Sequence, residues 1–171
     1  MGVQAALGYE FRSPNLFQRA NQKVASTPLG ARFFSMTVQR LDEMVARRTD
    51  GRTSASEVLA GLPVLRVTTT GRKSGQPREA PLIAVPIGDD LALLGTNFGG
   101  ATTPAWVYNL EAEPRAVAAY RDREVSVVAR PATDDEVEQV FARGRGIYGG
   151  YAKYRERIQG RELRVFVLEA A

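Results

Sequence analysis

Six short stretches rich in β-branched and other apolar residues constrain the fold of this chain more than any other feature. They cover residues 63–69, 80–87, 91–96, 116–120, 124–130 and 163–168. The turns Gly88-Asp89-Asp90 and Asp122-Arg123 each join two stretches over a few residues, which predicts β-hairpins. Because few helical stretches separate the strands, we expect an α+β fold built on a small antiparallel barrel, rather than a doubly wound parallel sheet. Pro81 and Pro86 predict an edge strand or a bulge, as expected where a barrel bends.

The first sixty residues have the pattern of helices. Ser13-Pro14 and Thr27-Pro28 each combine a capping hydroxyl with proline at the first helical position, and the second pair precedes a helix over residues 31–48. We expect residues 1–60 to form a helical leader packed on a barrel of residues 61–171, in one structural domain.

Three further helices are predicted among the strands. Thr103-Pro104 marks the start of a helix that runs to residue 113. The box Thr133-Asp134-Asp135-Glu136 opens a second helix, which we expect to run through Phe141 and to be followed by a glycine-rich joint. A tyrosine-bearing helix is expected near residues 148–157.

The chain contains neither cysteine nor histidine. This excludes thiol chemistry, iron–sulfur clusters, zinc fingers and serine–histidine triads, and it leaves only oxygen ligands for any metal. If the chain is an enzyme, a bound cofactor is expected to carry the difficult chemistry.

The net charge of +4 is unevenly distributed. Residues 53–78 carry four basic side chains against one acidic, whereas residues 79–142 carry four against eleven. Such segregation predicts a cationic face and an anionic partner. We expect a small molecule rather than nucleic acid, because no helix-turn-helix turn, ribonucleoprotein aromatic motif or basic coiled coil is present.

The turn over residues 70–78 is the first candidate for an anion site. Arg72, Lys73 and Arg78 lie within seven residues, in a turn that contains Gly71 and Gly75. Glycines allow backbone N–H groups to converge on an anion, and guanidinium and ammonium groups bind phosphate or carboxylate. The alternative is a solvated hairpin turn whose charges serve solubility.

Three other features carry open alternatives. The turn over residues 96–100 could present N–H groups to a ring carbonyl or phosphate, or be an ordinary turn. Trp106 could be a cofactor platform or part of the core. Tyr148, Tyr151 and Tyr154 share roughly one helix face, and they could line a substrate pocket or pack in the core.

Together and in this order, these segments resemble the deazaflavin-dependent nitroreductase family of actinobacteria, whose members use coenzyme F420. The resemblance is carried by the run TTTGRKSGQPREAPL from Thr68, the segments GTNFGG and TPAWVYNL, the tyrosine triplet, and the leader run FQRANQKVASTPLGARFF. It implies a split β-barrel related to flavin-binding oxidoreductases. It also implies hydride transfer from the reduced cofactor to a quinone, enone or nitroaromatic substrate.

The resemblance also implies roles for individual residues. Arg72, Lys73 and Ser74 would meet the phosphate and glutamate tail of the cofactor, with Arg78 as a second anion contact. Tyr151 would face the ring and the substrate, where its hydroxyl could donate a proton, while Tyr148 and Tyr154 would shape the pocket. The remaining cofactor contacts would be Glu79, Ala80, Pro81, Leu82, Ile83, Gly95, Thr96, Asn97, Phe98, Ala105, Trp106 and Asn109.

The chain departs from the family pattern at two positions. Phe98 stands where a lysine precedes the double glycine, and Ile83 stands in place of a tyrosine. The alternatives to an F420-dependent reductase are a reductase of the same fold that uses FMN and a non-catalytic protein that binds the deazaflavin or a lipid.

The expected location is cytoplasmic, because residues 1–12 lack the pattern of a signal peptide and no apolar stretch is long enough to span a bilayer. Phe33, Phe34 and Met36 could contact the inner face of the membrane, but we favour a role in covering one end of the barrel. Both a monomer and a homodimer are compatible with the sequence.

Overall fold

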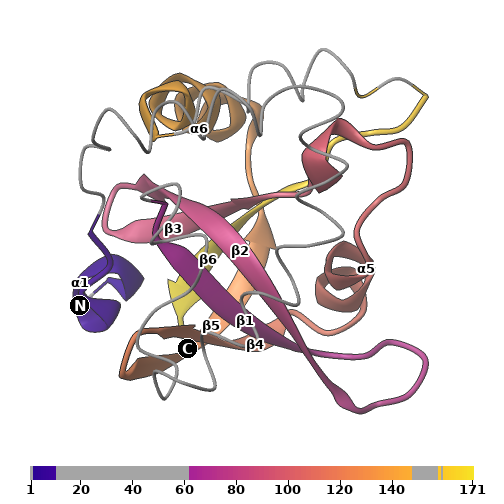
Figure 1. The fold of residues 1–171 in the computed structure, drawn as a ribbon, viewed down its shortest axis with the longest axis horizontal. Coiled ribbons are helices and arrows are strands. Elements are labelled where there is room, and N and C mark those ends of the chain that lie inside the picture. The colour runs from indigo at the N-terminus through magenta and orange to yellow at the C-terminus, as the bar shows by residue number, and fades with distance from the viewer. Residues whose placement is uncertain (1, 11–61, 148–157, 159) are drawn as a thin grey trace.

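The fold is a closed antiparallel barrel of six strands (Figure 1). The structure is a computed structural model that describes residues 2–10, 62–147, 158 and 160–171 of the 171-residue chain. The strands follow one another around the barrel in the order β1-β2-β3-β6-β5-β4. Their bounds are Val64–Thr70 (β1), Pro77–Ile87 (β2), Asp90–Leu94 (β3), Arg115–Tyr120 (β4), Arg123–Pro131 (β5) and Val165–Ala170 (β6).

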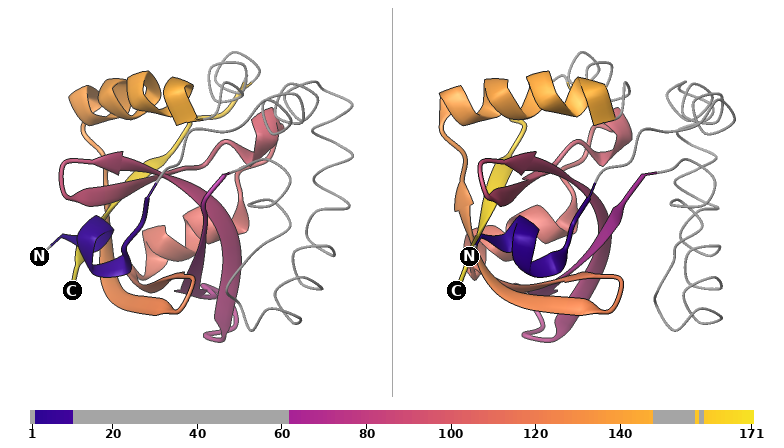
Figure 2. Two further views of the ribbon diagram at one scale, coloured as in Figure 1. Left: turned by 60° about the vertical axis from the view of Figure 1, so that its left-hand side comes forward. Right: turned by 90° about the vertical axis from the view of Figure 1, so that its left-hand side faces the viewer.

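Helices surround this barrel (Figure 2). Among the described residues they are α1 (Val3–Leu7), α5 (Ala105–Ala112) and α6 (Asp134–Ile147), with a 3₁₀ turn, η1 (Asn97–Gly99), before α5. The predicted fold class is confirmed, and so are the predicted hairpins, since β2 pairs with β3 and β4 pairs with β5 in antiparallel register.

The two prolines of β2 lie on either side of the point, between residues 83 and 84, where the strand changes partners. Residues 77–83 pair with β1, with Pro81 opposite Arg66, and residues 84–87 pair with β3, with Pro86 opposite Leu91. Each half of β2 thus has one partner strand in this register, so each proline occupies a local edge inside a closed barrel. Proline has no backbone N–H, and it is tolerated at such positions because the unpaired side of a strand needs no donor for a ladder hydrogen bond.

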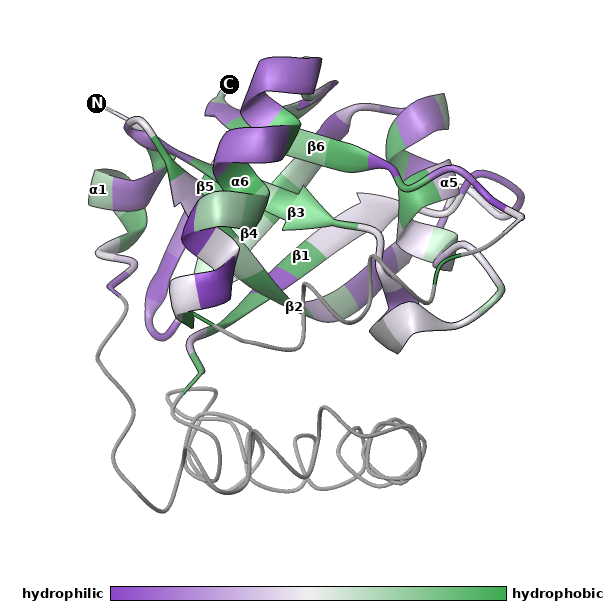
Figure 3. Ribbon diagram, turned by 90° about the horizontal axis from the view of Figure 1, so that it is seen from above, coloured by the Kyte–Doolittle hydropathy of each residue, from purple (hydrophilic) through white to green (hydrophobic). Residues whose placement is uncertain are grey.

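Two apolar clusters hold the described residues together. The first fills the barrel with inward-facing side chains of every strand, such as Leu65, Leu93 and Leu168, and it includes residues of α1 and α5. The second lies between α6 and the outer face of β2, β3 and β6, where Val85, Ala92 and Val167 are buried. Figure 3 shows α6 lying over these largely hydrophobic strands, with much of its own surface hydrophilic.

Helix α1, together with Gly8 and Tyr9, closes one end of the barrel; the sequence patterns did not single out Tyr9. The ring of Tyr9 is buried and packs edge-on against Tyr120, with 4.9 Å between ring centroids. Its hydroxyl oxygen lies 2.9 Å from the carbonyl oxygen of Pro63 and accepts the N–H of Ala84 at 3.1 Å. This part of the leader therefore packs on the barrel, while the proposed boundary at residue 60 stays a prediction.

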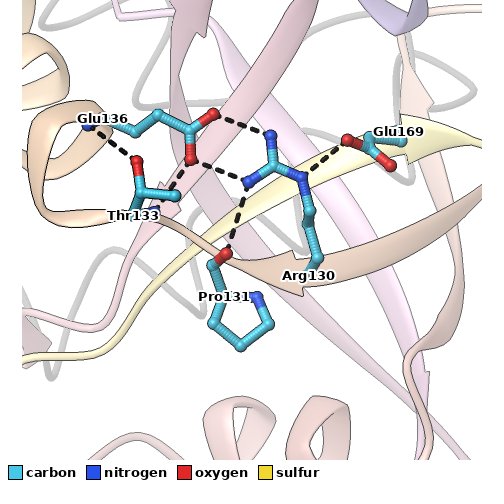
Figure 4. A network of polar contacts seen from close by, with 5 residues as sticks. All are labelled: Arg130, Pro131, Thr133, Glu136 and Glu169. Atoms are coloured by element: carbon cyan, nitrogen blue, oxygen red, sulfur yellow. Dashed lines mark hydrogen bonds and ion pairs between the residues drawn. The ribbon is translucent and has the colours of Figure 1, made fainter.

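Helix α6 begins with the predicted capping box. The N–H of Thr133 donates to Glu136 Oε2 at 2.9 Å, and the N–H of Glu136 donates to Thr133 Oγ1 at 3.3 Å. Arg130 adds two bonds to the Glu136 carboxylate, both 2.7 Å, and one to Glu169 at 2.6 Å (Figure 4). The Arg130 guanidinium, followed by the Thr133 N–H, lowers the pKa of Glu136 from 4.5 to about 2, and the two carboxylates raise the pKa of Arg130.

The prediction of a glycine-rich joint after Phe141 is wrong, because α6 continues through Gly144 and Gly146 to Ile147. Val140, Phe141, Gly144 and Ile147 are all buried, and their spacing places them on one helix face against the second cluster. Packing of this face outweighs the poor helix propensity of glycine.

Several sequence predictions fall outside the described residues. These are the helices expected over residues 13–48 and 148–157, the membrane candidates Phe33, Phe34 and Met36, and the three tyrosines Tyr148, Tyr151 and Tyr154. Within the ranges that the structure does describe, no helix combines the length and the apolar character that crossing a membrane requires.

Candidate functional site

Three of the predicted site segments lie on one side of the barrel. Helix α5 lies between the turn that joins β1 to β2 and the loop that contains η1, as the views in Figures 1 and 2 agree. Hydrogen bonds connect α5 to the turn, and an ion pair of 2.9 Å connects Glu111 of α5 to Arg164, just before β6. These contacts bring α5 beside the basic turn and beside the stretch that precedes β6.

The turn between β1 and β2 is closed by its own backbone. The N–H of Gly71 donates to the carbonyl oxygen of Gln76 at 2.8 Å, and the N–H groups of Ser74 and Gly75 donate to the carbonyl oxygen of Gly71. Gly75 has a φ of +66°, and a Cβ on Gly71 would lie 2.8 Å from Ser74 Oγ. The positive φ makes Gly75 the position where this turn favours glycine, whereas a side chain at Gly71 would require the exposed Ser74 side chain to move.

The cationic side chains of this turn point away from the barrel core. Arg72, Lys73 and Arg78 are exposed, and none of them forms an ion pair in the part of the chain that the structure describes. The Arg72 guanidinium lies over the ring of Tyr108, 4.6 Å from its centroid. This contact orients one of the three cations without neutralising it.

Asn109 ties the turn to α5. Its Oδ1 accepts the N–H of Arg72 at 3.1 Å, and its Nδ2 donates to Thr69 Oγ1 at 3.0 Å. The Thr69 hydroxyl in turn donates to the carbonyl oxygen of Arg78 at 3.2 Å. Because Asn109 and Thr69 are buried, these bonds fix the start and the end of the basic turn. The geometry makes Asn109 a positioning residue, and a direct cofactor contact from it stays a prediction.

Two other predicted α5 residues differ in their exposure. Trp106 is 7% exposed and packs in the barrel cluster, edge-on to Phe166 at 6.1 Å between centroids, whereas Ala105 is exposed. The packing of Trp106 thus matches the interpretation that it is part of the hydrophobic core. A contact between Trp106 and the cofactor stays a prediction. Tyr108, which lies in the predicted contact run of residues 105–109, is the one exposed large hydrophobic side chain among the described residues.

The loop after β3 is held from two directions. Asn97 Nδ2 donates to Oγ1 and to the backbone carbonyl oxygen of Thr102, both at 3.0 Å. The Arg161 guanidinium donates to the carbonyl oxygens of Gly95, Thr96 and Gly100 at 2.9 to 3.1 Å. Sequence reasoning missed Arg161, because no local pattern relates it to a loop 61 to 66 residues earlier. The side chain of Phe98, a predicted contact in this loop, is outside the described part.

The predicted residues of β2 divide between surface and core. Glu79 and Pro81 are exposed, Ala80 and Leu82 pack against the barrel interior, and Ile83 packs against the cluster under α6. Their cofactor contacts remain predictions.

Comparison with known proteins assigns the family. A family model described as F420H(2)-dependent quinone reductase matches residues 38–170, which include the basic turn, the loop after β3 and α5. The chain belongs to the F420H(2)-dependent quinone reductase family. The predicted resemblance to deazaflavin-dependent reductases is thereby confirmed.

The relatives agree with this family. A curated protein of Mycobacterium tuberculosis (strain H37Rv) named F420H(2)-dependent quinone reductase is 29% identical over 100 residues, which are 58% of this chain and 66% of the relative. A solved structure of an F420-H2 dependent reductase, FDR-A, superposes with a TM-score of 0.57 at 30% identity, covering 63% of this chain and 94% of that one. A structure described as a domain-swapped dimer gives a TM-score of 0.59 at 27% identity, covering 79% of this chain and 98% of that one.

Proposed function

We propose that this member of the F420H(2)-dependent quinone reductase family transfers hydride from reduced coenzyme F420 to a quinone, with enones and nitroaromatics as further substrates. The family assignment and the relatives' names support the use of F420 and a quinone. The observation that carries the proposal here is the preformed basic turn, in which three exposed cations are oriented on a backbone that its own hydrogen bonds and Asn109 hold in place.

The residues of this turn fit the chemistry of the cofactor. A deazaflavin with a phosphate and a glutamate tail is a long polyanion, and an arginine fork and a lysine suit phosphate and carboxylate groups. Arg72, Lys73 and Arg78 lack acidic partners among the described residues, so no ion pair within that part of the chain has to break before they bind an anion.

The bound cofactor would supply the hydride, and the protein would hold ring and substrate in a reactive geometry. In this proposal Arg72, Lys73, Ser74 and Arg78 bind the tail, and residues 95–98 lie beside the ring. Tyr151 faces the substrate and provides its hydroxyl as proton donor, while Tyr148 and Tyr154 shape the pocket. This arrangement needs no histidine, which the chain lacks.

A titration tests the proposal. Purified protein is titrated with coenzyme F420 while tryptophan fluorescence is followed, and reduced F420 is then mixed with menadione and its oxidation recorded. We expect micromolar binding and menadione-dependent oxidation. A protein that purifies yellow with FMN, or that binds F420 without turnover, would favour the FMN-dependent reductase or the non-catalytic binder, and absence of binding would overturn the proposal.

The oligomeric state and location are also proposed. The relative described as a domain-swapped dimer supports a homodimer over a monomer, and light scattering with size-exclusion chromatography distinguishes them. The cytoplasmic location and a peripheral membrane contact stay predictions, which cell fractionation and liposome co-sedimentation test.

A further inference from the structure

Arg161 braces the loop that follows β3. Its Nη1, Nη2 and Nε donate to the carbonyl oxygens of Gly95, Thr96 and Gly100 at 3.0, 2.9 and 3.1 Å. A fourth bond joins the same segments, because the N–H of Gly95 donates to the carbonyl oxygen of Arg164 at 2.9 Å. The stretch from Arg161 to Arg164 therefore holds both ends of the loop.

The Arg161 guanidinium and the Arg164 guanidinium bind different kinds of partner. Arg164 pairs with Glu111 and Glu162, whereas Arg161 forms no ion pair within the described ranges and binds only neutral carbonyl groups. Burial lowers the pKa of Arg161, while the nearby Tyr108 acts in the opposite direction. Arg161 thus remains a cation whose charge no carboxylate in these ranges offsets.

The three carbonyl bonds have a consequence for the outer side of the loop. Each carbonyl dipole directs its negative end at the guanidinium, so these oxygens are turned away from the side opposite Arg161. Without the guanidinium, the Gly95 and Gly100 carbonyl groups of this partly buried loop would lose their donor, and the Thr96 carbonyl would keep only the N–H of Gly99. The loop would then rearrange to bring the freed carbonyl groups to water.

We propose that Arg161 is a positioning residue for the cofactor ring, an inference that rests on the proposed F420 site. It fixes the backbone of residues 95–98 beside the ring and keeps three carbonyl oxygens from facing the ring's own carbonyl groups. Its role is separate from that of Arg72 and Lys73, which act on the phosphate and glutamate tail. Arg161 therefore affects binding of the deazaflavin ring whether or not the tail is present.

The test compares Arg161→Met with Arg164→Met, which removes a neighbouring charge but leaves the Arg164 carbonyl bond to Gly95. Two probes are titrated: coenzyme F420, and the same deazaflavin without phosphate and glutamates. We expect Arg161→Met to weaken both by a similar factor, about ten-fold, and Arg164→Met to change neither by more than about two-fold. Arg161→Lys should recover only part of the loss, because one ammonium cannot replace a planar fork.

Amide hydrogen exchange in the cofactor-free protein gives a readout that does not depend on binding. We expect faster exchange over residues 95–101 in Arg161→Met and wild-type exchange in Arg164→Met. Unchanged exchange and affinities in Arg161→Met would overturn the inference, as would a loss confined to the tailed cofactor. If Arg161→Met does not fold, Arg161→Lys carries the same comparison. A wild-type protein that binds neither probe contradicts the proposed function itself, and the inference with it.

Discussion

The side-chain oxygen of Asn109 accepts the backbone N–H of Arg72 at 3.1 Å. One buried amide on α5 thereby fixes the position from which the first cation of the basic turn extends. The same amide donates to Thr69 Oγ1, whose hydroxyl holds the carbonyl oxygen of Arg78 at the other end of the turn. The spacing of the three cations thus depends on a residue that carries no charge.

Asn109→Leu should weaken both stability and cofactor binding. The substitution leaves the Arg72 N–H and the Thr69 hydroxyl without their buried partner, and we expect a loss of about 1–3 kcal/mol in the free energy of unfolding. We expect F420 affinity to fall by roughly ten-fold, since the turn loses its anchor. Denaturant unfolding and cofactor titration measure these effects.

Thr69→Val is the matched comparison for Asn109→Leu. It removes the hydroxyl link to Arg78 and the acceptor of Asn109 Nδ2, but it leaves Asn109 Oδ1 to accept the Arg72 N–H, so its effect on F420 affinity should be smaller. Equal affinity losses in the two variants would contradict the assignment of the Arg72 anchor to Asn109.

Glu136 should make folding stability depend on pH in the acidic range. Its pKa is about 2 in the folded protein against an ordinary 4.5, so the stabilisation is complete above about pH 5 and is lost as pH falls toward 2. Because Arg130 is 38% exposed, solvent screening limits the contribution to about 1 kcal/mol. Urea unfolding at pH 7 and pH 3 should show Glu136→Gln destabilised at pH 7 and closer to wild type at pH 3.

The control for Glu136 is Glu124→Gln, which removes an exposed carboxylate from β5. Its difference from wild type should be small at both pH values. A stability gap between Glu136→Gln and wild type that widens on acidification would contradict the lowered pKa of Glu136 as the source of the pH dependence.

Tyr9→Phe should destabilise the barrel without affecting the cofactor. The variant keeps the ring contact with Tyr120 but removes the hydroxyl that accepts the N–H of Ala84 and lies within hydrogen-bond distance of the Pro63 carbonyl oxygen. We expect a loss of about 1–3 kcal/mol in the free energy of unfolding. F420 affinity should stay at the wild-type value, because α1 and α5 lie on different sides of the barrel (Figure 1). A stable variant with impaired F420 binding would refute this separation.

Local patterns in the sequence predicted the elements that depend on local chemistry. The strands, the hairpin turns and the Thr133 capping box follow from alternation, turn residues and capping, and the structure contains them. The glycine joint was wrong because burial of Gly144 is decided by the sheet against which it packs. The roles of Tyr9, Asn109 and Arg161 depend on partners 37 to 75 residues away, which no local pattern encodes.

The central claim is that the basic turn binds the anionic tail of the cofactor. The most direct measurement is the dissociation constant of Arg72→Gln/Lys73→Gln for F420 and for the deazaflavin that lacks the tail. Arg123→Gln, an exposed cation at the β4–β5 turn, is the control. The account predicts that the double variant loses about 10²-fold or more in F420 affinity, in a salt-dependent manner, and binds the tail-less deazaflavin as the wild type does. Equal losses for both ligands, or unchanged affinity for F420, would contradict it.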